Sequence, residues 1–157
     1  MILPQVKAKK ESDLVAALEG KMVMTRALLN ELIHILDAEY AAGMDYDLKR
    51  LKKLILRKQN SVKRFEHLAR DMGGQLGIMT GHEMPSGMPE HLVNQVEMIP
   101  GLTPGQKDVL LPLARELEQK HLALMKTARR NGVMFKTALN RMSVTSKYVN
   151  QGNVRTI

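Results

Sequence analysis

Residues 48–72 read LKRLKKLILRKQNSVKRFEHLARDM. Leucine and other apolar residues recur along this stretch at spacings of three and four, and basic residues fill most of the positions between them. Such a pattern places the apolar side chains on one face of an α-helix. The sequence therefore predicts an amphipathic helix over residues 47–72.

The ends of this helix and one break in its apolar stripe have local explanations. Asp45 or Asp47 can cap its first turn, and Gly73-Gly74 are expected to end it. Lys58 and Gln59 interrupt the apolar stripe. Either their long side chains pass along the edge of the core, or they form a buried polar pair that fixes the register of the packed helices.

Two further long helices are expected, one on each side of this stretch. The first covers residues 12–41, begins at Ser12, a residue type that favours the N-cap position, and is ended by Gly43. The third covers residues 106–144, and the Thr103–Gln106 segment before it has the capping-box pattern. Pro112 should kink this helix or mark a ragged first turn.

The chain between and after these helices has a different composition. Residues 73–105 hold seven of the 11 glycines and four of the 6 prolines, and no Lys or Arg. They are expected to form a loop with one short helix at 89–98, and the polar residues 145–157 a flexible tail. The prediction for residues 1–157 is a single all-α domain, an elongated antiparallel helical hairpin with a long third helix beside it.

Composition excludes several classes of protein. The 157 residues contain no cysteine, which excludes a disulfide framework and a cysteine nucleophile. No apolar run is long enough to span a membrane, and the N-terminus turns polar too soon for a secretory signal. A cytoplasmic protein without membrane insertion is the expectation.

The net charge of +8 is unevenly distributed. Residues 47–70 carry nine basic and two acidic residues and residues 103–157 carry ten and three, whereas residues 12–46 carry two and six. This alternation is typical of acidic and basic helices that pack side by side. A basic helical nucleic-acid-binding or regulatory protein is the alternative, although aromatic platforms for single strands and known DNA-binding motifs are missing. We therefore expect no nucleic-acid partner.

One spacing could indicate a metal site. Glu31-x-x-His34 and Glu118-x-x-His121 both match the Glu-x-x-His pattern of di-iron helical bundles. On a helical wheel Glu31 and His34 lie far from the apolar stripe and should face solvent, and Glu118 lies off the stripe of the third helix with His121 at its flank. We therefore expect neither metal nor cofactor, and no catalytic residue that would make the chain an enzyme.

The order of these features resembles a known family. Leu28–Leu32 and Asp37–Ala42 look like the first helix of FlgN-type flagellar export chaperones, and Leu48–Leu54 is similar to their second helix. Arg130–Met134 resembles an Asn-Gly segment of the last helix, and Tyr148 with the glycine after it resembles the tail. The resemblance implies a cytoplasmic type III export chaperone for hook-associated junction proteins, with Tyr148 docking at the export gate and its ATPase apparatus.

The end of the third helix is the candidate client-binding site. Its apolar residues cover more of the helix circumference than one packing seam needs: Val133, Met134, Phe135, Ala138, Leu139 and Met142. Asn131 lies on the apolar stripe, where it either fixes register as a satisfied core group or donates a hydrogen bond to the client. Alternatively, this surface is covered by the N-terminal residues Ile2, Leu3 and Val6, or by a second copy in a weak homo-oligomer.

Overall fold

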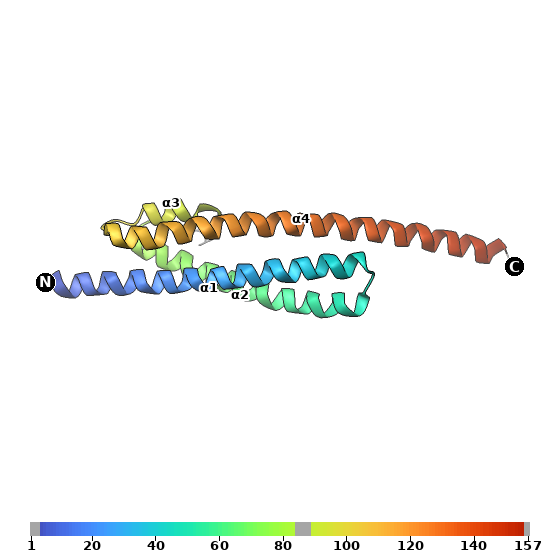
Figure 1. The fold of residues 1–157 in the computed structure, drawn as a ribbon, viewed down its shortest axis with the longest axis horizontal. Coiled ribbons are helices and arrows are strands. Elements are labelled where there is room, and N and C mark those ends of the chain that lie inside the picture. The colour runs from blue at the N-terminus through green and yellow to red at the C-terminus, as the bar shows by residue number, and fades with distance from the viewer. Residues whose placement is uncertain (1–3, 84–88, 156–157) are drawn as a thin grey trace.

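The structure is a computed structural model that describes the backbone of residues 4–83 and 89–155 and the side chains of residues 9–83 and 89–141. The predicted all-α fold is confirmed, and no strand occurs in these ranges. The elements are α1 (Pro4–Met44), α2 (Leu48–Thr80), the short 3-10 helix η1 (Pro89–His91), α3 (Leu92–Glu97) and α4 (Pro104–Arg155). Figure 1 shows an elongated molecule in which α1 and α2 form an antiparallel hairpin and α4 runs beside it, parallel to α1.

The turn between α1 and α2 is short and capped. α1 continues through Gly43, which was expected to follow its end, and stops at Met44. Tyr46 has a φ of 54°, in the left-handed region, so the chain reverses at this residue. The Asp47 carboxylate then accepts a hydrogen bond from the backbone N–H of Arg50 at 3.1 Å, which confirms its predicted role as the N-cap of α2.

The Gly73-Gly74 pair does not end α2, as the sequence had indicated. The helix continues to Thr80 and ends at Gly81, whose φ is 72°. Leu76 is fully buried in the extra turns. Burying a leucine contributes about 2 kcal/mol, comparable with the roughly 1 kcal/mol that each of Gly73 and Gly74 costs, and Met79 packs against the same core.

The start of α1 and the end of α4 also lie outside their predicted bounds. α1 begins at Pro4 rather than at Ser12, and proline is well tolerated in a first helical turn. α4 extends to Arg155, so most of the predicted tail from residue 145 is helical. Adding a turn to an existing helix avoids the cost of nucleation, and strong helix formers such as Lys9 and Lys10 occupy the added turns of α1.

The N-terminus of α4 has the predicted capping box. The Thr103 backbone N–H donates to Gln106 Oε1 at 3.0 Å, and the Gln106 N–H donates to Thr103 Oγ1 at 3.2 Å. Pro112 lies inside α4, which Figure 1 shows as one continuous helix. The proline therefore does not break the element that carries the candidate site.

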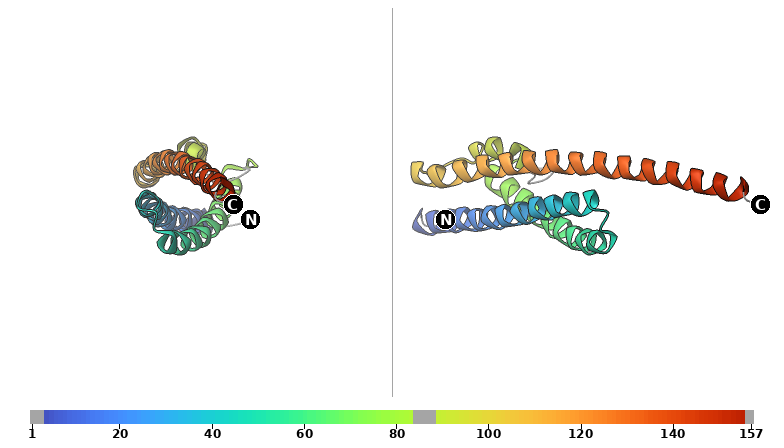
Figure 2. Two further views of the ribbon diagram at one scale, coloured as in Figure 1. Left: turned by 90° about the vertical axis from the view of Figure 1, so that its right-hand side faces the viewer. Right: turned by 45° about the vertical axis from the view of Figure 1, so that its right-hand side comes forward.

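At one end of the molecule the helices form a closed ring in the order α1, α2, α3 and α4. α1 packs against α2 and α4, and α3 packs against α4 and α2, whereas the backbones of α2 and α4 do not come close within the described residues. Figure 2 shows α3, in yellow-green, beside the N-terminal part of α4. The main core joins all four helices through Leu18, Met22, Leu28, Leu29, Leu32, Phe65, Leu68, Met72, Leu76, Leu92, Val96, Ile99, Leu110, Leu113, Ala114 and Leu117. At the other end, a smaller core joins only α1 and α2, with Phe135 of α4 packed against it: Ile35, Ala42, Leu51 and Leu54.

Candidate functional site

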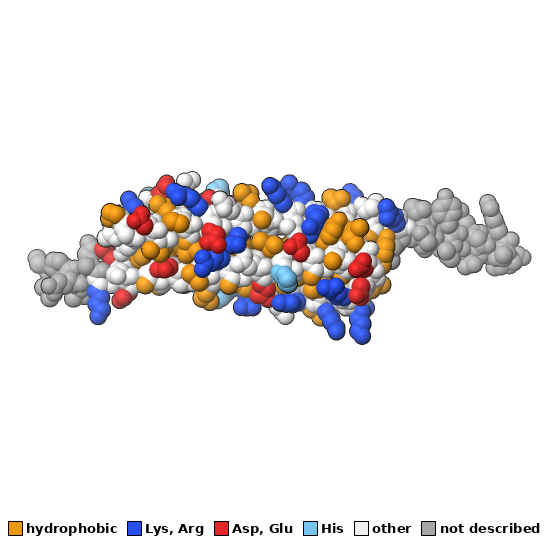
Figure 3. Space-filling view, in the orientation of Figure 1, with side chains coloured by type: hydrophobic (Ala, Val, Ile, Leu, Met, Phe, Trp, Pro, Cys, Tyr) orange, Lys and Arg blue, Asp and Glu red, His pale blue; other side chains and the backbone are white. Residues whose placement is uncertain are grey.

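Two grooves flank the C-terminal half of α4. The first, which we call the end groove, has a volume of about 510 Å³ and lies between α4 and the end of α1. Its lining consists of Tyr40, Gly43, Met44, Tyr46, Arg130, Val133, Met134, Thr137, Ala138 and Arg141. Figure 3 shows hydrophobic side chains gathered over the ends of α1 and α4, next to the grey atoms at the right.

Three of the predicted client-binding residues belong to the end groove. Val133 is 64% exposed, although it is a large apolar residue in the middle of a helix. Met134 and Ala138 are half-buried beside it. Methionine adapts its shape to different partners, so this wall of the groove suits a variable apolar ligand.

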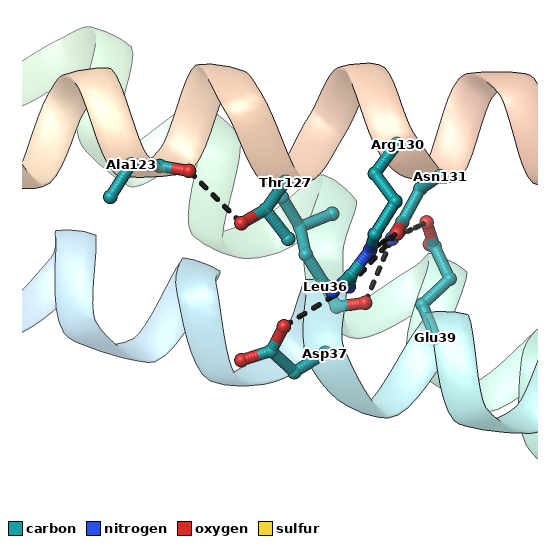
Figure 4. Close-up of polar contacts among 7 residues, drawn as sticks. All are labelled: Leu36, Asp37, Glu39, Ala123, Thr127, Arg130 and Asn131. Carbon is teal, nitrogen blue, oxygen red and sulfur yellow. Dashed lines mark hydrogen bonds and ion pairs between the residues drawn. The ribbon is translucent and has the colours of Figure 1, made fainter.

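Across the end groove, an aromatic ring of α1 contacts a cation of α4. The guanidinium carbon of Arg130 lies 4.0 Å from the centroid of the Tyr40 ring. Arg130 Nη2 also donates to Asp37 Oδ1 at 3.1 Å, so the guanidinium is held in place (Figure 4). Tyrosine and arginine are the residue types most often found at binding hot spots.

Sequence reasoning missed the α1 side of the end groove, namely Tyr40, Met44 and Tyr46. One signal was present in Gly43, which had been read only as a helix end. A Cβ atom added at Gly43 would lie 2.5 Å from both Sδ and Cε of Met134. At Gly43, therefore, the Met134 side chain of α4 packs directly against the backbone of α1 beside the groove.

The described start of α1 lies away from the end groove. α1 begins at the opposite end of the molecule from the end groove (Figure 1). The side chains of Ile2, Leu3 and Val6, which were considered as a cover, lie outside the described residues.

The second groove, which we call the bundle groove, lies between α2 and α4 with α1 as its floor. Its volume is about 310 Å³. Its lining consists of Leu32, Leu36, Glu39, Lys58, Val62, Leu124, Met125, Ala128, Asn131, Gly132 and Phe135. Phe135 therefore lies on the other side of α4 from Val133, and the predicted client surface is divided between two grooves.

One predicted site residue lines neither groove, and two others have side chains that the structure does not describe. Leu139 is 65% exposed on the surface of α4. The side chains of Met142 and Tyr148 lie outside the described residues, although the α4 backbone passes through both positions.

Asn131 is a buried structural group. It is 2% exposed, and its amide nitrogen donates to the Leu36 carbonyl at 2.8 Å and to Glu39 Oε1 at 3.2 Å. Its amide oxygen accepts from the guanidinium of Arg130 at 3.2 and 3.3 Å. Of the two interpretations of this residue, the contacts favour the one in which it fixes the register of α4 against α1 (Figure 4).

Lys58 completes the same network from α2. Its ammonium nitrogen lies 2.6 Å from Glu39 Oε2, and Glu39 is 1% exposed. At the break in the α2 stripe, half-buried Lys58 therefore pairs with the buried Glu39 carboxylate, whereas Gln59 is exposed. A lysine, a carboxylate and an amide thus join α2, α1 and α4 beneath the bundle groove.

The Glu-x-x-His pairs do not converge on one another. Glu31, expected to face solvent, lies against α2, where Oε1 accepts from Ser61 Oγ at 3.3 Å. The expectation failed because α1 packs on two sides, so its buried face is wider than one stripe. Glu118 Oε1 accepts from the Val93 N–H at 3.0 Å, and His121 is buried. Within the described residues, no three His, Asp or Glu side chains are placed to hold a metal ion.

Two broader findings bear on function. None of the helices in the described part of the chain is both long enough and apolar enough to cross a membrane. Comparison with protein-family models, with curated proteins and with solved structures found no match to this chain.

Proposed function

We propose that this chain is a helix-binding export chaperone of the FlgN type. In this role it holds the C-terminal helices of flagellar hook-associated junction proteins in the cytoplasm, keeps them unassembled and delivers them to the export gate. The proposal combines the resemblance of the helical segments Leu28–Ala42, Leu48–Leu54 and Arg130–Met134 with the open apolar surface of α4.

The end groove is the observation that carries the proposal. It has an exposed Val133 and a half-buried Met134 on α4, and Tyr40 of α1 lies against the guanidinium of Arg130. An amphipathic helix binds through apolar anchors that enter such a groove, and aromatic and arginine side chains commonly supply much of the binding energy. In this contact the chain supplies the groove, and the client supplies the amphipathic helix.

α4 is long enough to contact a client helix beyond the end groove. Figure 1 shows the last turns of α4 projecting past the α1–α2 turn, and α4 ends at Arg155. Tyr148 lies in this projecting part, and its assignment to export-gate docking rests on the resemblance alone.

A pair of charge substitutions tests the site. Val133→Glu places a carboxylate in the end groove, and Leu56→Glu places one at an equally exposed position on α2, since Leu56 is 63% exposed. Isothermal titration calorimetry with the C-terminal peptide of a junction protein from the same genome should give a dissociation constant raised about tenfold or more by Val133→Glu. Leu56→Glu should leave the dissociation constant unchanged.

Two outcomes would contradict the proposal, each in a different way. Equal weakening by both substitutions would mean that the client does not use the end groove. Failure of the unmodified chain to bind any junction-protein peptide, together with sequence-selective DNA binding at physiological salt, would favour the basic nucleic-acid-binding alternative.

A further inference from the structure

The bundle groove lies where the ring of helices is interrupted. At the end where the main core lies, α3 stands between α2 and α4 and packs against both. Beyond α3 toward the α1–α2 turn, α1 is still flanked by α2 and α4, but no described element stands between them. The bundle groove therefore occupies the position that a fourth helix takes in a four-helix bundle.

The walls of the bundle groove are apolar and open. Val62 on α2 and Met125 on α4 face it, and Met125 is 48% exposed. A Cβ atom added at Gly132 would meet nothing within 4 Å, so the space beside this glycine is empty. Leu124 and Phe135 mark the two ends of the α4 wall, about 16 Å apart at 1.5 Å per residue, which is about three helical turns.

The floor of the bundle groove requires no polar partner. Its polar groups, Lys58, Glu39 and Asn131, are bonded to one another. An occupant therefore has to present an apolar face to this groove, as one side of an amphipathic helix does.

The rims of the bundle groove are basic. On α4, Arg129 and Lys136 each follow a groove residue by one turn, and on α2, Lys63 adjoins Val62. These three side chains are exposed, and among the described residues none has a carboxylate within 4 Å. Glu66, one turn after Val62, is the acidic residue on the same rim, so the rims remain net positive.

We propose that the bundle groove is a second docking site, filled by one amphipathic helix of another protein whose flanks carry Asp or Glu. Charge complementarity across the rims selects such a helix and speeds its association. A second copy of this chain fits poorly, because its net charge is +8 and its acidic helix α1 is already covered by α2 and α4. The site is separate from the end groove and goes beyond the client binding proposed above.

A pair of designed peptides tests this docking site on the full chain. Both peptides carry three heptads with Leu at the a and d positions, one with Glu and the other with Lys at the flanking e and g positions. Fluorescence anisotropy should show binding of the acidic peptide, with the basic peptide about tenfold weaker or more. Gly132→Leu, which fills the groove, should weaken the acidic peptide about tenfold, and Arg129→Glu with Lys136→Glu should do the same without touching the core.

Val133→Glu, on the opposite side of α4, is the matched control and should leave the affinity for the acidic peptide unchanged. The proposal is overturned if the acidic peptide does not bind, if both peptides bind equally, or if neither set of bundle-groove substitutions weakens binding. It is also overturned if sedimentation shows a dimer of the unmodified chain that Gly132→Leu dissociates, because a second copy then fills the groove. None of these results changes the outcome of the Val133→Glu test with a junction-protein peptide.

Discussion

A carboxylate and an amide under the bundle groove fix how α4 lies on α1. Glu39 is almost completely removed from water and lies beside the Lys58 ammonium, while Asn131 donates to its other oxygen. Taking such groups out of water is costly, and apolar residues could stabilise the fold equally well. The network is therefore better explained by specificity, because sliding α4 by one turn, about 5.4 Å, would move Asn131 away from Glu39.

Removing Lys58 should destabilise the fold, because the buried Glu39 carboxylate then loses its ion-pair partner. Lys58→Met leaves Glu39 buried with only the amide of Asn131, so we expect the free energy of unfolding to fall by about 3 kcal/mol. Urea denaturation followed by circular dichroism measures this change. The double variant Glu39→Gln with Lys58→Met should recover most of the loss, since no charge is then buried.

A small effect of Lys58→Met on stability would contradict this expectation. If Lys58→Met stays within about 0.5 kcal/mol of the unmodified chain, the pair behaves as an ordinary exposed salt bridge and does not fix the helix register.

At the scale of the helices, local signals predicted the start of α2 and α4 but not the full length of the helices. The Asp47 cap and the Thr103–Gln106 capping box are short-range hydrogen-bond patterns, and both are present in the structure. The continuation of α2 past Gly73-Gly74 depends on the burial of Leu76 against other helices, which no local pattern reveals.

The same distinction explains which parts of the candidate site could be predicted. Val133 and Met134 were identified because the apolar residues of α4 exceed one packing seam. Tyr40 and Tyr46 were missed because they are far from α4 in the sequence, and only the folded structure brings them to the end groove. Lys58 was noticed as a break in the stripe, but its partner Glu39 lies on another helix.

Two glycines inside the long helices weaken them without a packing reason. A Cβ atom added at Gly20 in α1 or at Gly74 in α2 would meet nothing within 4 Å. Because alanine has a higher helix propensity, Gly20→Ala and Gly74→Ala should each raise the free energy of unfolding by about 1 kcal/mol. Thermal and urea denaturation measure the gain, and Gly81→Ala is the control that should destabilise, because Gly81 has a φ of 72°. A loss of stability in Gly20→Ala or Gly74→Ala would mean that the glycine serves a contact that the packing does not show.

At the scale of the whole molecule, oppositely charged residues meet between neighbouring helices, and the exterior is basic. Carboxylates of the acidic α1 pair with basic residues of both neighbours: Glu39 with Lys58, Asp37 with Arg130, and Glu31 with Arg57 and Arg64. This is the packing of acidic beside basic helices that the charge alternation predicted. Most of the other described Lys and Arg residues lie on α2 and α4, the two helices that border the bundle groove, and Lys9, Lys10, Lys21 and Arg26 lie on α1.

The central claim is that the C-terminal half of α4 forms the client-binding surface, and a truncation tests it most directly. A chain that ends at residue 132 keeps the main core and Asn131 but loses Val133, Met134 and the projecting end of α4. The measurement is the dissociation constant for a junction-protein C-terminal peptide, with circular dichroism to verify that the shortened chain is helical. We expect a soluble, helical protein that no longer binds the peptide. A shortened chain that binds the peptide with unchanged affinity would contradict the account and place the client site elsewhere.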